Sequence, residues 1–116
     1  MTEPLKKQPL YAYKGATFED CIVLRNERDE IQFLEDGNVL VFGIRPHYSG
    51  ECIIQRTWTV GDEADNAYFI NLTPEETDIE PDEYKYDVSI QTADGDFYKV
   101  IPESPFVVLE STTKKQ

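Results

Sequence analysis

The chain has 116 residues, of which 23 are acidic and 11 are basic, and its net charge is −12. This length fits a single domain, because domains usually hold about 100–150 residues. The acidic balance disfavours binding to nucleic acid and to anionic membrane surfaces, because both require cations that replace counterions. A hydrophobic content of 40% and an aromatic content of 12% indicate a folded chain rather than a disordered acidic one.

The termini and the cysteines predict an intact chain that is made in the cytosol. The longest uncharged apolar run, residues 38–44, is far shorter than the roughly 20 residues of a membrane helix, so no membrane insertion is expected. Residues 1–14 lack the apolar segment and the cleavage site of a secretory signal. In an unsecreted chain, Cys21 and Cys52 are expected to be reduced core residues rather than a disulfide.

Three parts are predicted along the chain. Residues 1–13 are interrupted by prolines and lack periodicity, so they are interpreted as an amino-terminal arm whose apolar residues are Leu5, Leu10, Tyr11 and Tyr13. Residues 14–110 contain short apolar runs that alternate with turn signals about every ten residues, the pattern of an all-β sandwich or barrel. Residues 111–116 form a polar tail.

The first half of the domain predicts strands over residues 17–24, 31–34, 39–45, 52–60 and 68–72. Residues 39–45 are apolar at nearly every position, which predicts a central strand covered on both faces. Residues 52–60 alternate, with Arg56 as the exception on the apolar face. On this parity Trp58 is expected in the core together with Cys52 and Ile54.

A helical turn is predicted at residues 74–79. Thr73 precedes Pro74 at the first helical position, and Glu76 follows three residues after the threonine, which is the pattern of a capping box. Pro81 would prevent a longer helix from continuing. We therefore expect one short helical turn that crosses between the sheets.

The second half of the domain predicts a β-hairpin. Apolar and polar residues alternate with a period of two over residues 84–92, which predicts a strand. Asp94-Gly95 then allows a tight turn, and residues 96–101 form the returning strand. Pro102 and Pro105 are expected to break the ladder before a final strand at 106–110, which suggests a switch of sheet or an edge position. Tyr84, at the start of the alternating strand, is either a tyrosine corner or an ordinary core aromatic.

No residue pattern points to catalysis. His47 is the only histidine and lies beside Pro46 in an expected loop, and the six glycines do not form a phosphate-binding loop. Acidic clusters at 62–66, 75–78 and 82–83 are candidates for a calcium site. They lack, however, the spaced aspartates and the central glycine of a calcium-binding loop. We therefore expect no catalytic residue, no cofactor and no metal. A small calcium-binding adhesive sandwich and a compact hydrolase with paired carboxylates remain the alternatives.

One series of motifs resembles a known family. Residues 72–77, Pro81, residues 84–88 and Asp94-Gly95 occur in the order found in small immunoglobulin-like β-sandwich domains of phage and prophage structural proteins, such as the amino-terminal domain of baseplate upper proteins. The likeness extends upstream to residues 14–18, 38–45 and 53–59, and covers about residues 13–110. The chain differs in having Pro81-Asp82-Glu83 where the family commonly has a Pro-Gly turn.

The resemblance implies a non-enzymatic virion structural or assembly module of a phage tail or baseplate. Such a module would be assembled in the cytoplasm of the bacterial host and would contact other tail or baseplate proteins or copies of itself. It implies a sandwich of about seven or eight strands with immunoglobulin-like connections, with Trp58, Pro74, Tyr84 and Tyr86 in structural roles. The arm, or an edge strand near 106–109, is expected to pair with a neighbouring subunit by strand addition.

Overall fold

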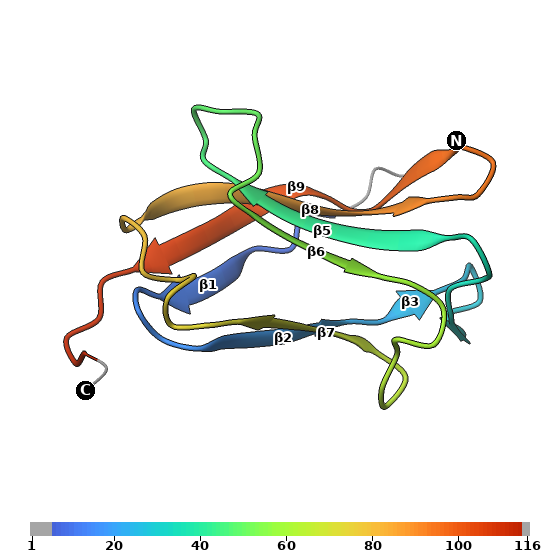
Figure 1. Cartoon of the computed structure of the whole chain (residues 1–116), viewed down its shortest axis with the longest axis horizontal. Coiled ribbons are helices and arrows are strands. Elements are labelled where there is room, and N and C mark those ends of the chain that lie inside the picture. The colour runs from blue at the N-terminus through green and yellow to red at the C-terminus, as the bar shows by residue number, and fades with distance from the viewer. Residues whose placement is uncertain (1–5, 115–116) are drawn as a thin grey trace.

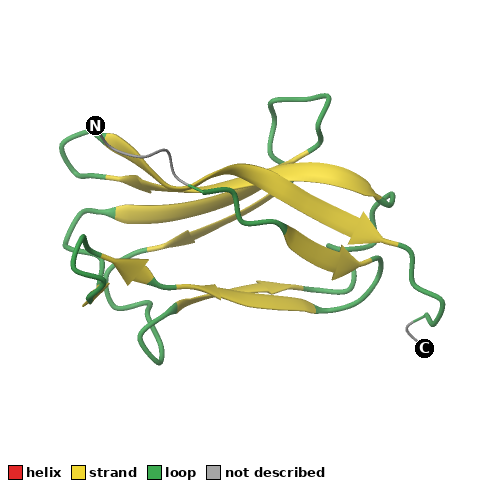
Figure 2. Cartoon of the chain, turned by 180° about the vertical axis from the view of Figure 1, so that it is seen from behind, coloured by secondary structure: helices red, strands yellow, loops and turns green. Residues whose placement is uncertain are grey.

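The computed structural model describes residues 6–114, and this part of the chain contains strands, turns and loops but no helix (Figures 1 and 2). Nine strands follow one another in chain order: β1 (Leu10–Tyr13), β2 (Phe18–Ile22), β3 (Leu24–Arg25), β4 (Ile31–Gln32), β5 (Val39–Arg45), β6 (Ile54–Trp58), β7 (Tyr68–Leu72), β8 (Asp82–Gln91) and β9 (Phe97–Leu109). The predicted seven or eight strands differ mainly because the arm contributes a strand, residues 17–24 form two strands, and the last two predicted strands are one.

The strands form an all-β sandwich, as predicted. A five-stranded sheet has the order β1-β9-β8-β5-β6 and lies over a two-stranded sheet of β2 and β7, with β3 and β4 pairing separately (Figure 1). Side chains from both layers meet in one core, in which Leu40, Phe42, Tyr68 and Ile70 are at most 2% exposed. The immunoglobulin-like connections implied by the resemblance stay a prediction.

Strand β5 is central, with the predicted bounds. It pairs antiparallel with β6 on one side and with β8 on the other. Leu40, Phe42 and Ile44 on its inner face are fully buried, whereas Val39 and Val41 on the outer face are only half-buried. The prediction that both faces are covered is therefore wrong, because no second layer lies over the outer face in the described part of the chain.

The end of the predicted arm belongs to the sheet. Leu10–Tyr13 is β1, which pairs in parallel with Phe106–Leu109 of β9. Ala12 is 3% exposed and Leu10 packs against the core, so alternate side chains of this short strand fill a gap at the sheet edge. The predicted boundary between an arm at 1–13 and a domain from 14 is thus wrong for residues 10–13. Leu5 lies outside the described residues.

Strand β9 runs without a break from Phe97 to Leu109, so the predicted interruption at Pro102 and Pro105 is wrong. Its ladder with β8 shifts register on both sides of Val88, which accommodates extra residues in β9. The prolines are tolerated because β1 begins to pair with β9 only at Phe106. On that side of β9 a missing N–H therefore costs no ladder hydrogen bond, as on an edge strand.

The predicted helical turn after Thr73 is absent, although its capping box is present. The Thr73 N–H donates to Oε1 of Glu76 over 2.9 Å, and the Glu76 N–H donates to Oγ1 of Thr73 over 3.2 Å. Only the Thr77 N–H bonds four residues back, to the carbonyl of Thr73, and the chain then turns away. One such bond gives a hydrogen-bonded turn, because a helix needs several consecutive ones to offset the entropy of its nucleus.

Tyr84 makes the hydrogen bond predicted for a tyrosine corner. It is 7% exposed, and its hydroxyl donates to the carbonyl of Glu80 over 2.7 Å. We expect Tyr84→Phe to lower the free energy of unfolding by about 0.5–1.5 kcal/mol, the usual net value of such a bond. Urea denaturation measures the loss. Tyr48→Phe, at a tyrosine that is 79% exposed, is the control and is expected to leave stability unchanged.

The cysteines are free, but the prediction that they are core residues is wrong. Cys21 lies in β2 on the face opposite to the buried Phe18 and Ile22, and Cys52 precedes β6. Both are exposed. Trp58 is in the core as predicted, with 9% of its surface exposed and its ring 6.5 Å from that of Tyr68.

Candidate interaction surface

The open edge formed by β1 brings together most of the residues that were predicted to make contacts. Ala12 faces the core, whereas Tyr11 and Tyr13 face outward and are 62% and 56% exposed. Tyr11 lies beside Val107 of β9, and Tyr13 lies beside Leu109, which is 37% exposed. These four side chains, Tyr11, Tyr13, Val107 and Leu109, are called the β1 patch below. The patch leaves aromatic and aliphatic surface in water.

The backbone of β1 also faces outward. The N–H of Lys14 donates to the carbonyl of Leu109 over 2.8 Å. In a strand the bonding groups alternate in direction, so the N–H groups of Tyr11 and Tyr13 and the carbonyl of Tyr11 point away from β9. The carbonyl of Tyr13 accepts from the N–H of Ala16 instead. The edge therefore offers the main-chain groups that an added strand would use.

The arm, or alternatively the strand near 106–109, was predicted to pair with a neighbouring subunit; in this chain β1 and residues 106–109 of β9 pair with each other. The tie extends upstream of β1, where the Gln8 N–H donates to Oγ of Ser104 over 3.0 Å and the hydroxyl of Tyr86 donates to the Gln8 carbonyl. Tyr86 is 2% exposed, and burial, with the nearby charge of Asp20, raises the pKa of Tyr86 to about 12. Deleting residues 1–13 would thus remove part of the fold as well as a contact surface.

The opposite edge of the large sheet is protected by a charge on its inner face. Arg56 of β6 points toward the sandwich interior and pairs with Glu76 at 2.5 Å. The same guanidinium donates to the carbonyl of Asn71 in β7 over 3.3 Å, so it links the two layers. The hydrogen bonds from Arg56 hold the pKa of Glu76 below its usual value. Inward-pointing charges of this kind are a common defence of edge strands against added strands.

The edge at β2 carries a similar feature. Asp20 lies between the buried Phe18 and Ile22 on the same face of the strand, and its Oδ1 accepts the backbone N–H of Cys21 over 2.8 Å. By contrast, the inner face of β1 carries only Leu10 and Ala12. Strand β1 thus lacks the inward-facing charge that β6 and β2 carry.

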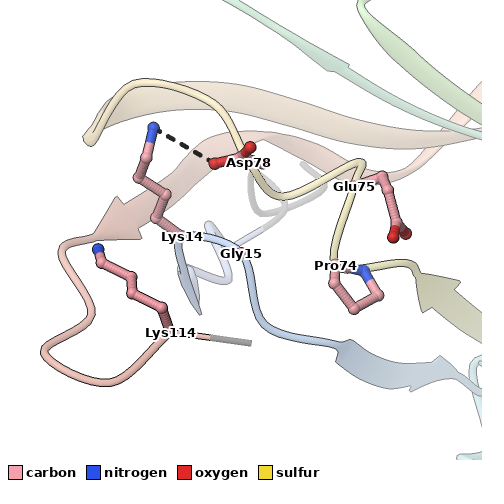
Figure 3. Close-up of a pocket in the computed structure, with 6 residues that line it drawn as sticks. All are labelled: Lys14, Gly15, Pro74, Glu75, Asp78 and Lys114. Carbon is pink, nitrogen blue, oxygen red and sulfur yellow. Dashed lines mark ion pairs between the residues drawn. The ribbon is translucent and has the colours of Figure 1, made fainter. Parts of the chain in front are cut away.

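A shallow hollow of about 270 Å³ lies where the chain leaves β1, lined by Lys14, Gly15, Pro74, Glu75, Asp78 and Lys114 (Figure 3). Lys14 reaches across it to Asp78 at 3.6 Å and to the carbonyl of Ile79 at 3.3 Å. Gly15 adopts a φ of 75°, which a side chain rarely permits, and its N–H donates to the carbonyl of Thr77. These contacts anchor the turn after β1 to the segment that follows β7.

The other residues singled out in the sequence lie apart from the β1 patch. Pro74 lines the hollow. Trp58 is buried in the core, and Tyr84 forms the tyrosine corner. His47 is exposed, with Nε2 3.2 Å from a carboxylate oxygen of Asp82. The role of Arg56 was missed, although an arginine at a core-facing position of a strand is a signal that an acidic partner must be near.

Carboxylates of the acidic clusters take part in local contacts. Asp62 accepts the backbone N–H of Thr59, Glu63 accepts that of Gly61, and Glu76 and Asp78 pair with Arg56 and Lys14. Within residues 6–114, no group of three or more histidine, cysteine or acidic side chains is arranged to hold a metal ion. In the same range, no helix is long and apolar enough to cross a membrane.

Comparison with known proteins adds no relative: the chain matches no protein-family model and no curated protein sequence.

Proposed function

We propose that this chain is a structural or assembly module of a phage or prophage particle, of its tail or baseplate, and that it acts through protein–protein contacts. The observation that carries the proposal is the β1 patch on an open sheet edge, with Tyr11 and Tyr13 more than half exposed. Large aromatic side chains in this setting are typical anchors of interfaces. The order of motifs shared with phage sandwich domains supports the particle context.

Strand addition is the mode of contact that the surface favours. The outward backbone groups of Tyr11 and Tyr13 supply a ladder, and the β1 patch supplies apolar contact on one face of the added strand. Tail or baseplate proteins and further copies of this chain are the proposed partners. The proposed place of action is the virion, after assembly in the bacterial cytoplasm.

The double variant Tyr11→Ser/Tyr13→Ser tests the proposal. Both side chains are exposed, so the free energy of unfolding is expected to change by less than about 1 kcal/mol. Assembly is expected to weaken at least about tenfold, because buried interface tyrosines often contribute more than about 1 kcal/mol each. Sedimentation of the chain, alone and mixed with the proteins encoded beside it, measures assembly.

The matched control is Tyr48→Ser/Phe69→Ser, which removes two exposed aromatic rings far from β1 in the sequence. Unchanged assembly of the Tyr11/Tyr13 variant, or an equal loss in the control, would refute the role of the β1 patch. A gene neighbourhood that encodes no tail or baseplate protein would argue against the particle context while leaving the contact surface intact.

A further inference from the structure

The outward main-chain groups of β1 form a short run. Both groups of Tyr11 and the N–H of Tyr13 point away from β9, because Lys14 donates to β9 and the bonding groups of a strand alternate in direction. Upstream, Gln8 uses its N–H and its carbonyl for bonds to β9 and β8, so the same alternation turns the carbonyl of Pro9 outward. In chain order, the free groups are the carbonyl of Pro9, the N–H and the carbonyl of Tyr11, and the N–H of Tyr13.

Each end of this run is closed by the chain itself. Pro9 has no N–H, because its ring replaces the proton. The carbonyl of Tyr13 already accepts the N–H of Ala16 over 3.1 Å. A continuous antiparallel strand of another protein would therefore leave one carbonyl opposite Pro9 and one N–H opposite Tyr13 without a partner, which is unfavourable where water is excluded. The edge thus favours a strand that lacks the same two groups.

A second copy of β1 is such a strand when it pairs antiparallel with Tyr11 opposite Tyr11 of the copy. The two Tyr11 residues then exchange both of their hydrogen bonds. In each direction the N–H of Tyr13 donates to the carbonyl of Pro9 in the other copy. The missing N–H of Pro9 faces the carbonyl that Ala16 already occupies, so no group of the run stays unpaired. A shift of the register by two residues would place Tyr11 opposite Pro9 or Tyr13 of the copy and leave one of its groups without a partner.

The outward side chains fit the same register. Tyr11 would lie between Val107 of its own β9 and Tyr11 of the copy, so the two exposed rings meet as a cross-strand aromatic pair. Tyr13 would lie between its own Leu109 and the Pro9 ring of the copy. Antiparallel pairing about Tyr11 therefore covers the sides of the apolar groups in the β1 patch.

The remaining opposed positions contain no conflict of size or charge. On the inner face Leu10 would lie opposite the small Ala12 of the copy. Beyond the run, Lys14 would lie opposite the uncharged Gln8. Like charges directly opposite one another would destabilise a strand pair, and this register has none over residues 8–14.

We propose that the partner of the β1 patch is a second copy of this chain, joined antiparallel through β1 about a two-fold axis at Tyr11. This inference rests on the proposed function, whose possible partners it narrows to one. The large sheets of the two copies would become one continuous sheet with the two β1 strands at its centre. Each copy presents the same surface to the other, so the contact closes at two copies.

Cysteine cross-linking tests the register in a Cys21→Ser/Cys52→Ser background, which removes the two native thiols. Tyr11→Cys would place two Cα atoms about 5.5 Å apart across the axis, within the range of ~4.4–6.8 Å that a disulfide spans. Tyr13→Cys is the matched control, with similar exposure on the same strand, but its two Cα atoms would lie more than about 13 Å apart. On mild oxidation, Tyr11→Cys is expected to form covalent dimers at least about tenfold faster than Tyr13→Cys. Non-reducing electrophoresis measures both rates.

Sedimentation equilibrium of the unaltered full chain alone is expected to show a monomer–dimer equilibrium at submillimolar concentration. A chain that stays monomeric, or equal cross-linking at positions 11 and 13, would overturn the inference. A monomeric chain that still joins the proteins encoded beside it through Tyr11 and Tyr13 would refute the second copy but uphold the proposed function. A dimer with the expected cross-link and no such association would uphold the second copy and argue against the role in a phage particle.

Discussion

Phe106→Ala is expected to lower the free energy of unfolding by about 3–5 kcal/mol, the usual cost of removing a buried phenylalanine side chain. Phe106 is 1% exposed. Its ring makes edge-to-face contacts with Phe18 at 5.3 Å and Tyr86 at 6.4 Å, so it joins the two layers of the sandwich. It also lies opposite Leu10 and Tyr84 in the neighbouring strands. The cavity left by alanine would loosen both layers and the attachment of β1 together.

Phe97→Ala is the matched control, because Phe97 lies on the same strand but is 55% exposed. It loses only a cation–π contact with Lys99 at 5.1 Å, so the expected cost is less than about 1 kcal/mol. Urea denaturation followed by the fluorescence of Trp58 measures both variants. Losses of similar size for the two phenylalanines would contradict the assigned core.

Stability is expected to fall steeply as the pH rises above about 10, and Tyr86 is expected to account for a large share of the fall. Its pKa is about 12 in the folded chain, whereas the ordinary value of tyrosine is 10.0. Between these values the unfolded chain has released the phenolic proton and the folded chain still holds it. The unfolded state is thus favoured as the pH rises, by up to roughly 3 kcal/mol for a shift of this size.

The pKa values of Tyr68 and Tyr84 are also raised, mainly by burial, so they add to the same alkaline loss. Tyr86→Phe isolates the share of Tyr86. At neutral pH the variant loses the hydroxyl bond to Gln8, but between about pH 10 and about pH 12 its stability is expected to fall less steeply. Parallel stability curves for the variant and the unaltered chain over this range would refute the assignment.

The elements that could be predicted from the sequence are those set by local patterns. The strand over Val39–Arg45 follows from seven nearly continuous apolar positions bounded by a turn, and its bounds agree with β5. The hairpin of β8 and β9 follows from a period of two and the Asp94-Gly95 turn, in which Gly95 has a φ of 90°. In each case neighbouring residues along the chain contain the whole signal.

What could not be predicted depends on partners far away in the sequence. Leu10 lies opposite Phe106, and nothing in residues 1–13 shows which strand they will meet. The same pairing explains the error at Pro102 and Pro105, because a proline is compatible with a strand only where its missing N–H has no partner.

The link between Arg56 and Glu76 has a consequence for the size of the complexes this chain can form. With the β6 edge obstructed by a charge that reaches into the opposite layer, the large sheet can be extended only on the side of β1 and β9. A large sheet with a single extendable side accepts a partner there and offers no opposite edge of the same sheet to the next one. Under the strand addition proposed above, growth through the large sheet would therefore end in a discrete assembly and not continue into a fibre.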